Sequence, residues 1–125
     1  SREIAWEKLV QLGKVINKTT NKLQKKVVFI ASADQGHSHD EEGPYGYDPA
    51  SLEYDQLICE MVQNNELYKL LDLSPEFIEK AKPDSIWQML ILEGIIQETN
   101  LTNTFYAYDC PTYFGMLVAS YEKEN

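Results

Sequence analysis

Two histidines separated by one residue are the side chains of this chain best suited to chemistry. His37 and His39 are the only two histidines in the sequence, and histidine exchanges a proton near neutral pH or binds a metal ion. In an extended segment, residues two apart point to the same side, so both rings could reach one pocket. A polar surface loop would explain the same pair, and both interpretations stay open on spacing alone.

The other reactive groups are less specific. Asp40, Glu41 and Glu42 are adjacent carboxylates that lack the spacing of a calcium loop, which favours a solvated charge run. Cys59 falls on an amphipathic helical pattern, which favours core packing. Cys110 precedes a proline at a strand end and could line a pocket, but the sequence identifies no base that would activate its thiol.

Asp84 is a further candidate because it follows Pro83 at a predicted helix start. Aspartate caps helix N-termini well, so capping is the structural interpretation of this residue. The sequence contains no phosphate-binding Walker loop, no dinucleotide-binding fingerprint and no zinc-protease helix motif. These absences exclude the enzyme classes that short motifs identify.

The elements around the histidines predict where a site would lie. Apolar residues at three- and four-residue spacings predict an amphipathic helix over residues 3–23. Residues 26–33 form a continuous apolar run rich in β-branched side chains, which is typical of a strand buried on both faces of a parallel sheet. The strand leads into a loop, residues 34–49, that carries both histidines. Ligands of open α/β sheets bind beyond the carboxyl ends of strands, so we expect the site in this loop.

Helices dominate the rest of the chain. We predict a helix from Pro49 to the Asn64-Asn65 pair, and short helices over residues 66–72 and 75–81, the last capped by Ser74. A helix that starts near Asp84 and runs to residue 96 is apolar on nearly all sides and should be buried. Residues 104–109 and 113–121 have strand preference, although the second run fits a helix equally well.

The predicted fold class is α/β. One strand with a fully buried signature and two candidates at the far end are too little sheet for a doubly wound domain. We therefore expect residues 1–125 to be the C-terminal part of a single domain. That domain would be a three-layer α/β/α sandwich with a mostly parallel central sheet.

Composition and charge limit the partners. The chain has 125 residues, with 20 acidic and 11 basic side chains and a formal charge of −9. Nucleic acid is excluded as a partner, because a phosphate-binding surface needs clustered Lys and Arg. The cluster between Lys22 and Lys26 is short and fits a solvated helix end or strand entry. Two distant cysteines, no apolar leader and no long apolar run predict a reduced cytoplasmic protein without a membrane span.

Several segments together resemble one enzyme family. These are IASADQGH at residues 30–37, EGPYGYDP at residues 42–49 and EYD at residues 53–55. They are similar to the class III extradiol ring-cleavage dioxygenases, and more narrowly to the catalytic subunit of protocatechuate 4,5-dioxygenase and its relatives. The similarity continues through residues 87–94 and 111–116. It covers most of this chain but only about the second half of a family member.

The resemblance implies a reaction and its cofactor. Family members hold a non-haem Fe(II) with two histidines and one carboxylate, and use dioxygen to open a catechol-type ring beside its hydroxyl groups. The substrate implied is an aromatic diol or aminophenol. His37 matches the family's acid/base histidine. His39 has no clear counterpart, and we expect it to orient His37 or to touch substrate.

The resemblance also implies a carboxylate ligand and a pocket wall. The family's iron-binding glutamate falls on Asp84 in this chain, with Glu79 as an alternative. Aspartate is one carbon shorter than glutamate, so its oxygens lie closer to the backbone. The substrate-binding candidates by position are Tyr45, Tyr47, Thr112 and Tyr113.

Two iron-binding histidines of the family come from its N-terminal half, which this chain does not contain. We therefore predict that this polypeptide does not cleave catechols by itself. The expected partner is the missing N-terminal half or a complementing subunit, and exposed sheet edges favour an oligomer. Two other hypotheses remain: a non-catalytic binding protein on the same fold, and a zinc- or nickel-binding module built on His37 and His39.

Overall fold

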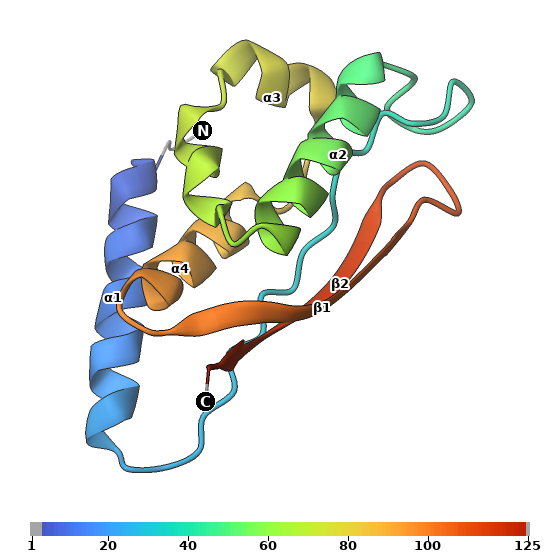
Figure 1. Cartoon of the computed structure of the whole chain (residues 1–125). Helices are drawn as coiled ribbons and strands as arrows, with labels where there is room; N and C mark the ends of the chain where they lie inside the picture. The colour runs from blue at the N-terminus through green and yellow to red at the C-terminus, as the bar shows by residue number, and fades with distance from the viewer. Residues whose placement is uncertain (1–3, 125) are drawn as a thin grey trace.

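The computed structural model describes residues 4–124 as a set of helices and one β-hairpin (Figure 1). In chain order the elements are α1 (Trp6–Lys22), α2 (Pro49–Gln63), the 3-10 helix η1 (Leu67–Asp72), α3 (Pro75–Ala81), α4 (Ile86–Gln97), β1 (Leu101–Asp109) and β2 (Met116–Lys123). All of the predicted helices are confirmed within the described residues, outside which residue 3 of the first predicted helix lies, and the one at residues 66–72 is of the tighter 3-10 type. The second C-terminal run is a strand, which settles the helix alternative.

Local capping explains where α2 and α3 begin. The Asp48 carboxylate accepts from the Ala50 backbone N–H at 2.9 Å, and the Ser74 hydroxyl accepts from the Phe77 N–H at 3.2 Å. Each cap is followed by a proline at the first helical position, where the missing N–H costs nothing. The capping role considered for Asp84 is wrong, because α4 begins at Ile86 and its N-cap is Ser85.

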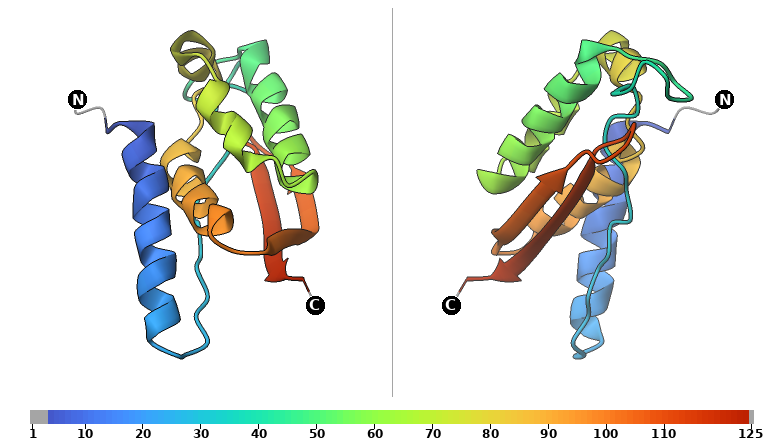
Figure 2. Two further views of the ribbon diagram at one scale, coloured as in Figure 1. Left: turned by 60° about the vertical axis from the view of Figure 1, so that its left-hand side comes forward. Right: turned by 90° about the vertical axis from the view of Figure 1, so that its right-hand side faces the viewer.

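Helix α4 lies between α1 and the hairpin (Figure 2). Two glycines allow α1 and α4 to approach closely: a Cβ on Gly94 would lie 1.9 Å from the Val10 carbonyl oxygen, and one on Gly13 would lie 2.0 Å from the Ile91 oxygen. The contact therefore excludes any larger residue at either position.

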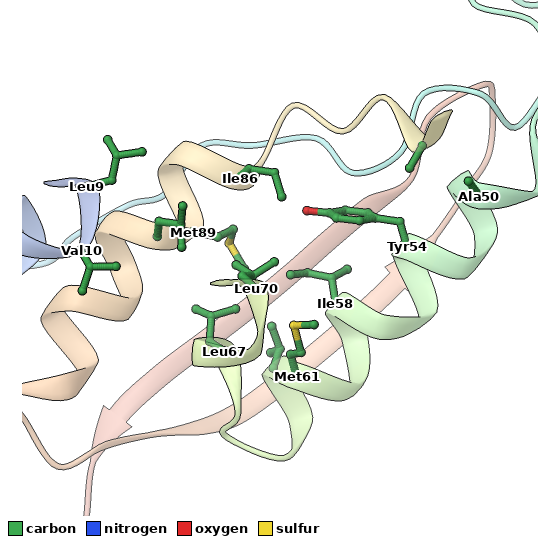
Figure 3. Packing of buried hydrophobic residues seen from close by; sticks show 13 residues of the cluster. Leu9, Val10, Ala50, Tyr54, Ile58, Met61, Leu67, Leu70, Ile86 and Met89 are labelled. Carbon is green, nitrogen blue, oxygen red and sulfur yellow. The ribbon is translucent and has the colours of Figure 1, made fainter. Parts of the chain in front are cut away.

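The hydrophobic core joins α2, η1 and α4, and the inner face of α1 closes it (Figure 3). Its largest fully buried apolar members are Tyr54, Ile58, Val62, Leu67, Leu70 and Leu90. The buried Tyr54 hydroxyl is hydrogen-bonded to the Ser85 hydroxyl at 2.7 Å. This bond ties α2 to the start of α4, beside the segment that carries the histidines.

The predicted buried strand at residues 26–33 is not part of a sheet. The segment is extended, but within residues 4–124 its backbone forms no backbone–backbone hydrogen bond. Val28 and Ile30 are 83% and 80% exposed. An apolar run indicates a preference for burial, whereas a strand also needs a neighbouring strand to bond, and this segment has none in the described chain.

The sheet itself also differs from the prediction. Strands β1 and β2 pair antiparallel, with Leu101 opposite Lys123 and Asp109 opposite Met116. Over the described range this hairpin is the whole sheet, so the molecule mixes helix and strand without the three-layer, mostly parallel arrangement we expected. The turn at residues 110–115 brings the tip of the hairpin back toward α2 and the histidine loop (Figure 1).

Candidate functional site

Residues 34–39, which we call the anchored segment, carry His37 and His39 and are bonded along their whole length. Each of the six backbone N–H groups donates a hydrogen bond. The acceptors, in chain order, are the Asp84 oxygen (3.1 Å), the Gly115 oxygen (2.9 Å), Asp55 Oδ1 (2.8 Å), the Ala81 oxygen (3.0 Å), Ser51 Oγ (2.8 Å) and the Tyr113 oxygen (3.3 Å). The acceptors come from α2, from the end of α3 with the connection that follows it, and from the hairpin turn. The backbone of this segment is therefore fixed by three separate parts of the molecule.

The His37 ring is oriented by a backbone carbonyl. Its Nδ1 lies 2.9 Å from the Lys82 oxygen. A carbonyl oxygen only accepts hydrogen bonds, so Nδ1 carries the proton, and in the neutral ring Nε2 carries the lone pair. The Asp34 carboxylate lies 3.9 Å from Nε2 and would stabilise a proton there. This arrangement presents Nε2 as the basic atom.

Three aromatic rings surround the His37 imidazole. Phe114 stacks on it with ring centroids 5.5 Å apart and planes 19° from parallel. Tyr45 meets it edge-on at 5.7 Å, and Tyr113 lies at 5.9 Å. Tyr45 and Tyr113 are two of the predicted pocket-wall residues. Phe114 had no predicted role, although its place directly after Tyr113 in the family-like segment was the signal that could have identified it.

His39 is turned to a different partner. Its Nε2 lies 2.8 Å from Asp55 Oδ2, and the Tyr108 hydroxyl donates to the same oxygen. The other Asp55 oxygen accepts the Gly36 N–H. Asp55 has no exposed surface, so its carboxylate depends on these three donors. Burial, together with the hydrogen bond to Asp55, raises the pKa of the Tyr108 hydroxyl and keeps it a donor.

Sequence reasoning missed Asp55 and Tyr108. The available signal was weak: an aspartate in the EYD triplet of the family-like region, beside a tyrosine on the buried face of a helix. Tyr108 gave no signal, because only the fold brings β1 to α2.

The remaining predicted residues have other contacts. Asp84 pairs with Asp34 through two backbone hydrogen bonds of 3.1 Å, and it is exposed. Glu79 faces solvent and lies 3.9 Å from Lys82 Nζ. Tyr47 is 62% exposed and forms an isolated bridge with His39. Thr112 contributes a carbonyl to the Cys110 thiol in the hairpin turn.

Neither cysteine is activated. Both are free. Burial raises the pKa of the Cys59 thiol to about 11, and Cys59 packs against the hydrophobic core as expected. Burial also raises the pKa of Cys110. A raised thiol pKa lowers the thiolate fraction at neutral pH, which makes both groups poor nucleophiles.

The residues present do not assemble a complete metal site. Among residues 4–124, no group of three or more His, Cys, Asp or Glu side chains is placed to hold one ion. His37 is bonded to Lys82 and His39 to Asp55, so the two rings do not converge as the zinc- or nickel-module hypothesis requires. Any iron held here would need ligands in addition to those of residues 4–124.

A large hollow lies away from the histidines. It has a volume of about 600 Å³ and is bounded by residues 27–33, α1, α4 and the hairpin. Gln35 and Tyr121 line it, and the Gln35 Oε1 and Tyr121 hydroxyl atoms are buried without a hydrogen-bond partner in the part of the chain described. His37 and its three aromatic neighbours do not border this hollow, so it is a separate feature.

Comparison with known proteins identifies the family. The chain is 24% identical over 101 residues to a curated Clostridium acetobutylicum protein that carries no functional name, an alignment covering 81% of this chain and 22% of that relative. The chain thus spans about a fifth of that relative's length. No helix in the described residues is both long and apolar enough to span a membrane. A family model, that of the catalytic LigB subunit of aromatic ring-opening dioxygenases, matches residues 4–118, and the chain belongs to this family.

Proposed function

We propose that His37 is the general acid/base of an extradiol ring-cleavage dioxygenase, and that the substrate is a catechol-type diol or an aminophenol. The observation that carries this proposal is the 2.9 Å contact between His37 Nδ1 and the Lys82 oxygen, which leaves Nε2 free to accept a proton. Nε2 would take a proton from a substrate hydroxyl and return it later in the reaction. Asp34 would stabilise the imidazolium in between.

The aromatic surroundings support an aromatic substrate. Tyr45, Tyr113 and Phe114 present flat faces and edges around the His37 ring, and aromatic groups prefer stacked or edge-on contact with one another. We include Thr112 in the pocket wall by its position beside Tyr113. Tyr47 would contribute at the rim.

We propose Fe(II) as the cofactor of the whole protein, with Asp84 as one ligand. In its support, Asp84 is exposed and lies two residues beyond the carbonyl that orients His37. Residues 4–124 lack a full ligand set, so the two further ligands would come from outside this range. When bound, the iron would bring the diol and dioxygen together.

We also propose that residues 1–125 are the C-terminal part of one dioxygenase domain, and that residues 26–33 join a parallel sheet completed by the missing part or by a complementing subunit. Eight extended residues with no backbone partner in the described chain support this proposal, as does the exposure of Val28 and Ile30. The 600 Å³ hollow beside the same residues is further space for that partner. Before the partner binds, such an edge favours oligomers.

The test is a ring-cleavage assay on the complete protein. It would be loaded with Fe(II) under anaerobic conditions and then given catechol and dioxygen, while the yellow ring-opened product and oxygen consumption are followed. We expect turnover by the complete protein and none by residues 1–125 alone. Replacing His37→Gln should lower kcat/KM by about 10²–10⁴-fold, the usual contribution of general acid/base catalysis.

Asp40→Asn is the matched control. Asp40 lies in the same loop and is exposed, and its carboxylate accepts only the nearby Glu42 N–H among its described side-chain contacts, so activity should stay unchanged. Full activity of His37→Gln would contradict the acid/base role. Product formation by residues 1–125 alone would contradict the need for outside ligands. Catechol binding without turnover by the iron-loaded complete protein would favour the non-catalytic alternative.

A further inference from the structure

The strongest feature that the proposed function leaves unused is the buried carboxylate of Asp55. It lies where the two segments that build the His37 site meet. Asp55 Oδ1 accepts the N–H of Gly36, the residue just before His37. The neighbouring hairpin turn, which supplies Tyr113 and Phe114, is bonded to the same stretch through Gly115: the Gly115 N–H donates to the Gly36 oxygen at 3.0 Å.

The Asp55 carboxylate is closely packed against Gly115 of the hairpin turn. A Cβ on Gly115 would lie 1.9 Å from Asp55 Oδ2 and 2.9 Å from the Tyr108 oxygen. The carboxylate is thus enclosed by the turn on one side and by Gly36 on the other. A shift of Asp55 would move the backbone that carries His37 and the turn that carries its aromatic neighbours together.

Two side chains fix Asp55 in this place. His39 Nε2, at 2.8 Å, and the Tyr108 hydroxyl both meet Oδ2. A carboxylate only accepts, so neutral His39 must carry its proton on Nε2, whereas His37 carries its proton on Nδ1. The two histidines therefore have opposite tautomers, and the His39 atom that bonds Asp55 corresponds to the His37 atom that stays free.

We propose that Asp55 is a positioning residue for His37, and that His39 and Tyr108 hold the Asp55 carboxylate in place instead of contacting substrate. This inference rests on the proposed acid/base role of His37. It assigns the second histidine of the His-Ser-His motif to support of the site. It also gives a role to the fully buried carboxylate that lies against Gly115 in the hairpin turn.

The test uses nitrogen NMR of the 125-residue chain labelled at histidine, which contains two histidines and therefore gives two sets of ring signals. Spectra would be recorded at about pH 8.5, where ordinary imidazoles are neutral. We expect His37 with its proton on Nδ1 and His39 with its proton on Nε2. His39 protonated on Nδ1 in the unmodified chain would overturn the proposal.

Substitutions then test whether a change at Asp55 alters the tautomer of His37. Asp55→Asn keeps an oxygen for Gly36 but offers an NH₂ group to His39, so His39 should switch to the Nδ1–H tautomer while His37 keeps its own. Asp55→Ala also removes the Gly36 acceptor, so His37 should become a mixture of tautomers. Asp40→Asn, an exposed carboxylate in the same loop, should change neither ring.

Circular dichroism at the same temperature would establish that each variant is folded. If Asp55→Ala does not fold, His39→Phe and His39→Gln make the same comparison: glutamine keeps a donor to Asp55 and should preserve the His37 tautomer, while phenylalanine should not. A single, unchanged His37 tautomer in folded Asp55→Ala, or in both His39 variants, would overturn the positioning role.

The readout needs no substrate and no iron. A failed ring-cleavage assay with the expected tautomer changes would therefore refute the proposed function alone. A successful assay with unchanged tautomers would refute the inference alone.

Discussion

Two consecutive stretches of the chain, residues 26–33 and the anchored segment at residues 34–39, are both extended but are held very differently. The first forms no backbone–backbone hydrogen bond within residues 4–124 and exposes Val28 and Ile30. In the second, every backbone N–H has an acceptor, and Gln35 and Ser38 are 1% exposed. The more apolar stretch is the one that is left uncovered.

The difference shows that available partners, and not local sequence, decide which of the two segments has its backbone groups hydrogen-bonded. Residues 34–39 find acceptors in side chains and loops of their own chain. Residues 26–33 consist of strand-forming side chains, which need a neighbouring strand for their backbone groups. The candidate site can therefore be preorganised in a chain whose predicted central strand is still unpaired.

The largest expected effect comes from adding a side chain at Gly115, against the buried Asp55 carboxylate. In Gly115→Ala the new methyl group would meet Asp55 Oδ2, so the substitution should lower the free energy of unfolding by about 3 kcal/mol, the upper part of the usual range for overpacking. Urea unfolding followed by circular dichroism measures this. Ser120→Ala on β2 should lower the free energy of unfolding far less. Equal losses for both variants would show that Gly115 is not closely packed against Asp55.

Hydrogen exchange tests the comparison directly. Amides of residues 34–39 should exchange at least about 100-fold more slowly than those of residues 26–33, because exchange of the former requires opening of a bonded segment. Amides of α2 near Ile58 provide the reference for the slowest exchange. Equal protection of both stretches would remove the contrast, and would indicate that residues 26–33 find a partner in solution.

Removing one donor to Asp55 should have an intermediate effect. Tyr108→Phe should destabilise the chain by about 2 kcal/mol, because a hydrogen bond to a buried charged group is lost. Tyr106→Phe is the matched control on the same strand: its hydroxyl bonds the Gln63 side chain in an exposed position, and its loss should cost less than about 0.5 kcal/mol. Similar losses for both variants would contradict a special role for Tyr108.

Tyr108→Phe should also change how the free energy of unfolding depends on pH in the alkaline range. The pKa of Tyr108 is raised in the folded chain, so the folded state retains this proton at pH values where the unfolded state loses it. The contribution of Tyr108 to stability is then constant below about pH 10, the ordinary tyrosine pKa, and is lost as pH rises above it. Tyr108→Phe should make the alkaline fall in stability shallower without abolishing it, because burial also raises the pKa of Tyr121 to about 12. An unchanged slope in urea titrations between pH 9 and pH 11 would refute the assignment.

The smallest effect is expected in the uncovered stretch. Val28→Lys should change the free energy of unfolding of this chain by no more than about 0.5 kcal/mol, because the side chain it replaces already faces solvent. Ile58→Lys, at a fully buried position, should prevent folding. Sedimentation would show whether Val28→Lys also reduces self-association, and a large loss of stability would mean that Val28 is covered in solution.

The helices were predictable from the sequence because their signals are local. The Ser74-Pro75 start of α3 is a cap followed by a residue already set in helical geometry, and α4 is recognisable from its nearly continuous apolar residues. The strand at residues 26–33 was wrong for the described chain because a ladder of hydrogen bonds requires residues distant in sequence or in another chain. The apolar pattern of residues 26–33 gives no information on whether such partner residues are present.

The site was predictable in part. Position in the two family-like segments, the loop at residues 34–49 and residues 111–116, was enough to select His37, Tyr45 and Tyr113, which the structure brings together. The Lys82 carbonyl, Asp55 and Tyr108 were not predictable, because a backbone oxygen has no sequence signature and an aspartate in an amphipathic helix resembles a solvent-facing residue. Their roles come from contacts between residues far apart in the sequence.

The bonds that hold residues 34–39 also set an order of events during folding. The backbone N–H groups of Gln35, Gly36 and His37 bond acceptors far along the chain. These acceptors are on Gly115, Asp55 and Ala81, so forming the segment closes several long loops at once. Closing such loops costs chain entropy before any contact compensates for it, and contacts of this kind form slowly. The helices can form before the hairpin turn has been synthesised, whereas the surroundings of His37 cannot. The arrangement of side chains around the His37 ring is therefore a late product of folding, and its appearance marks the point at which the chain has reached its native topology.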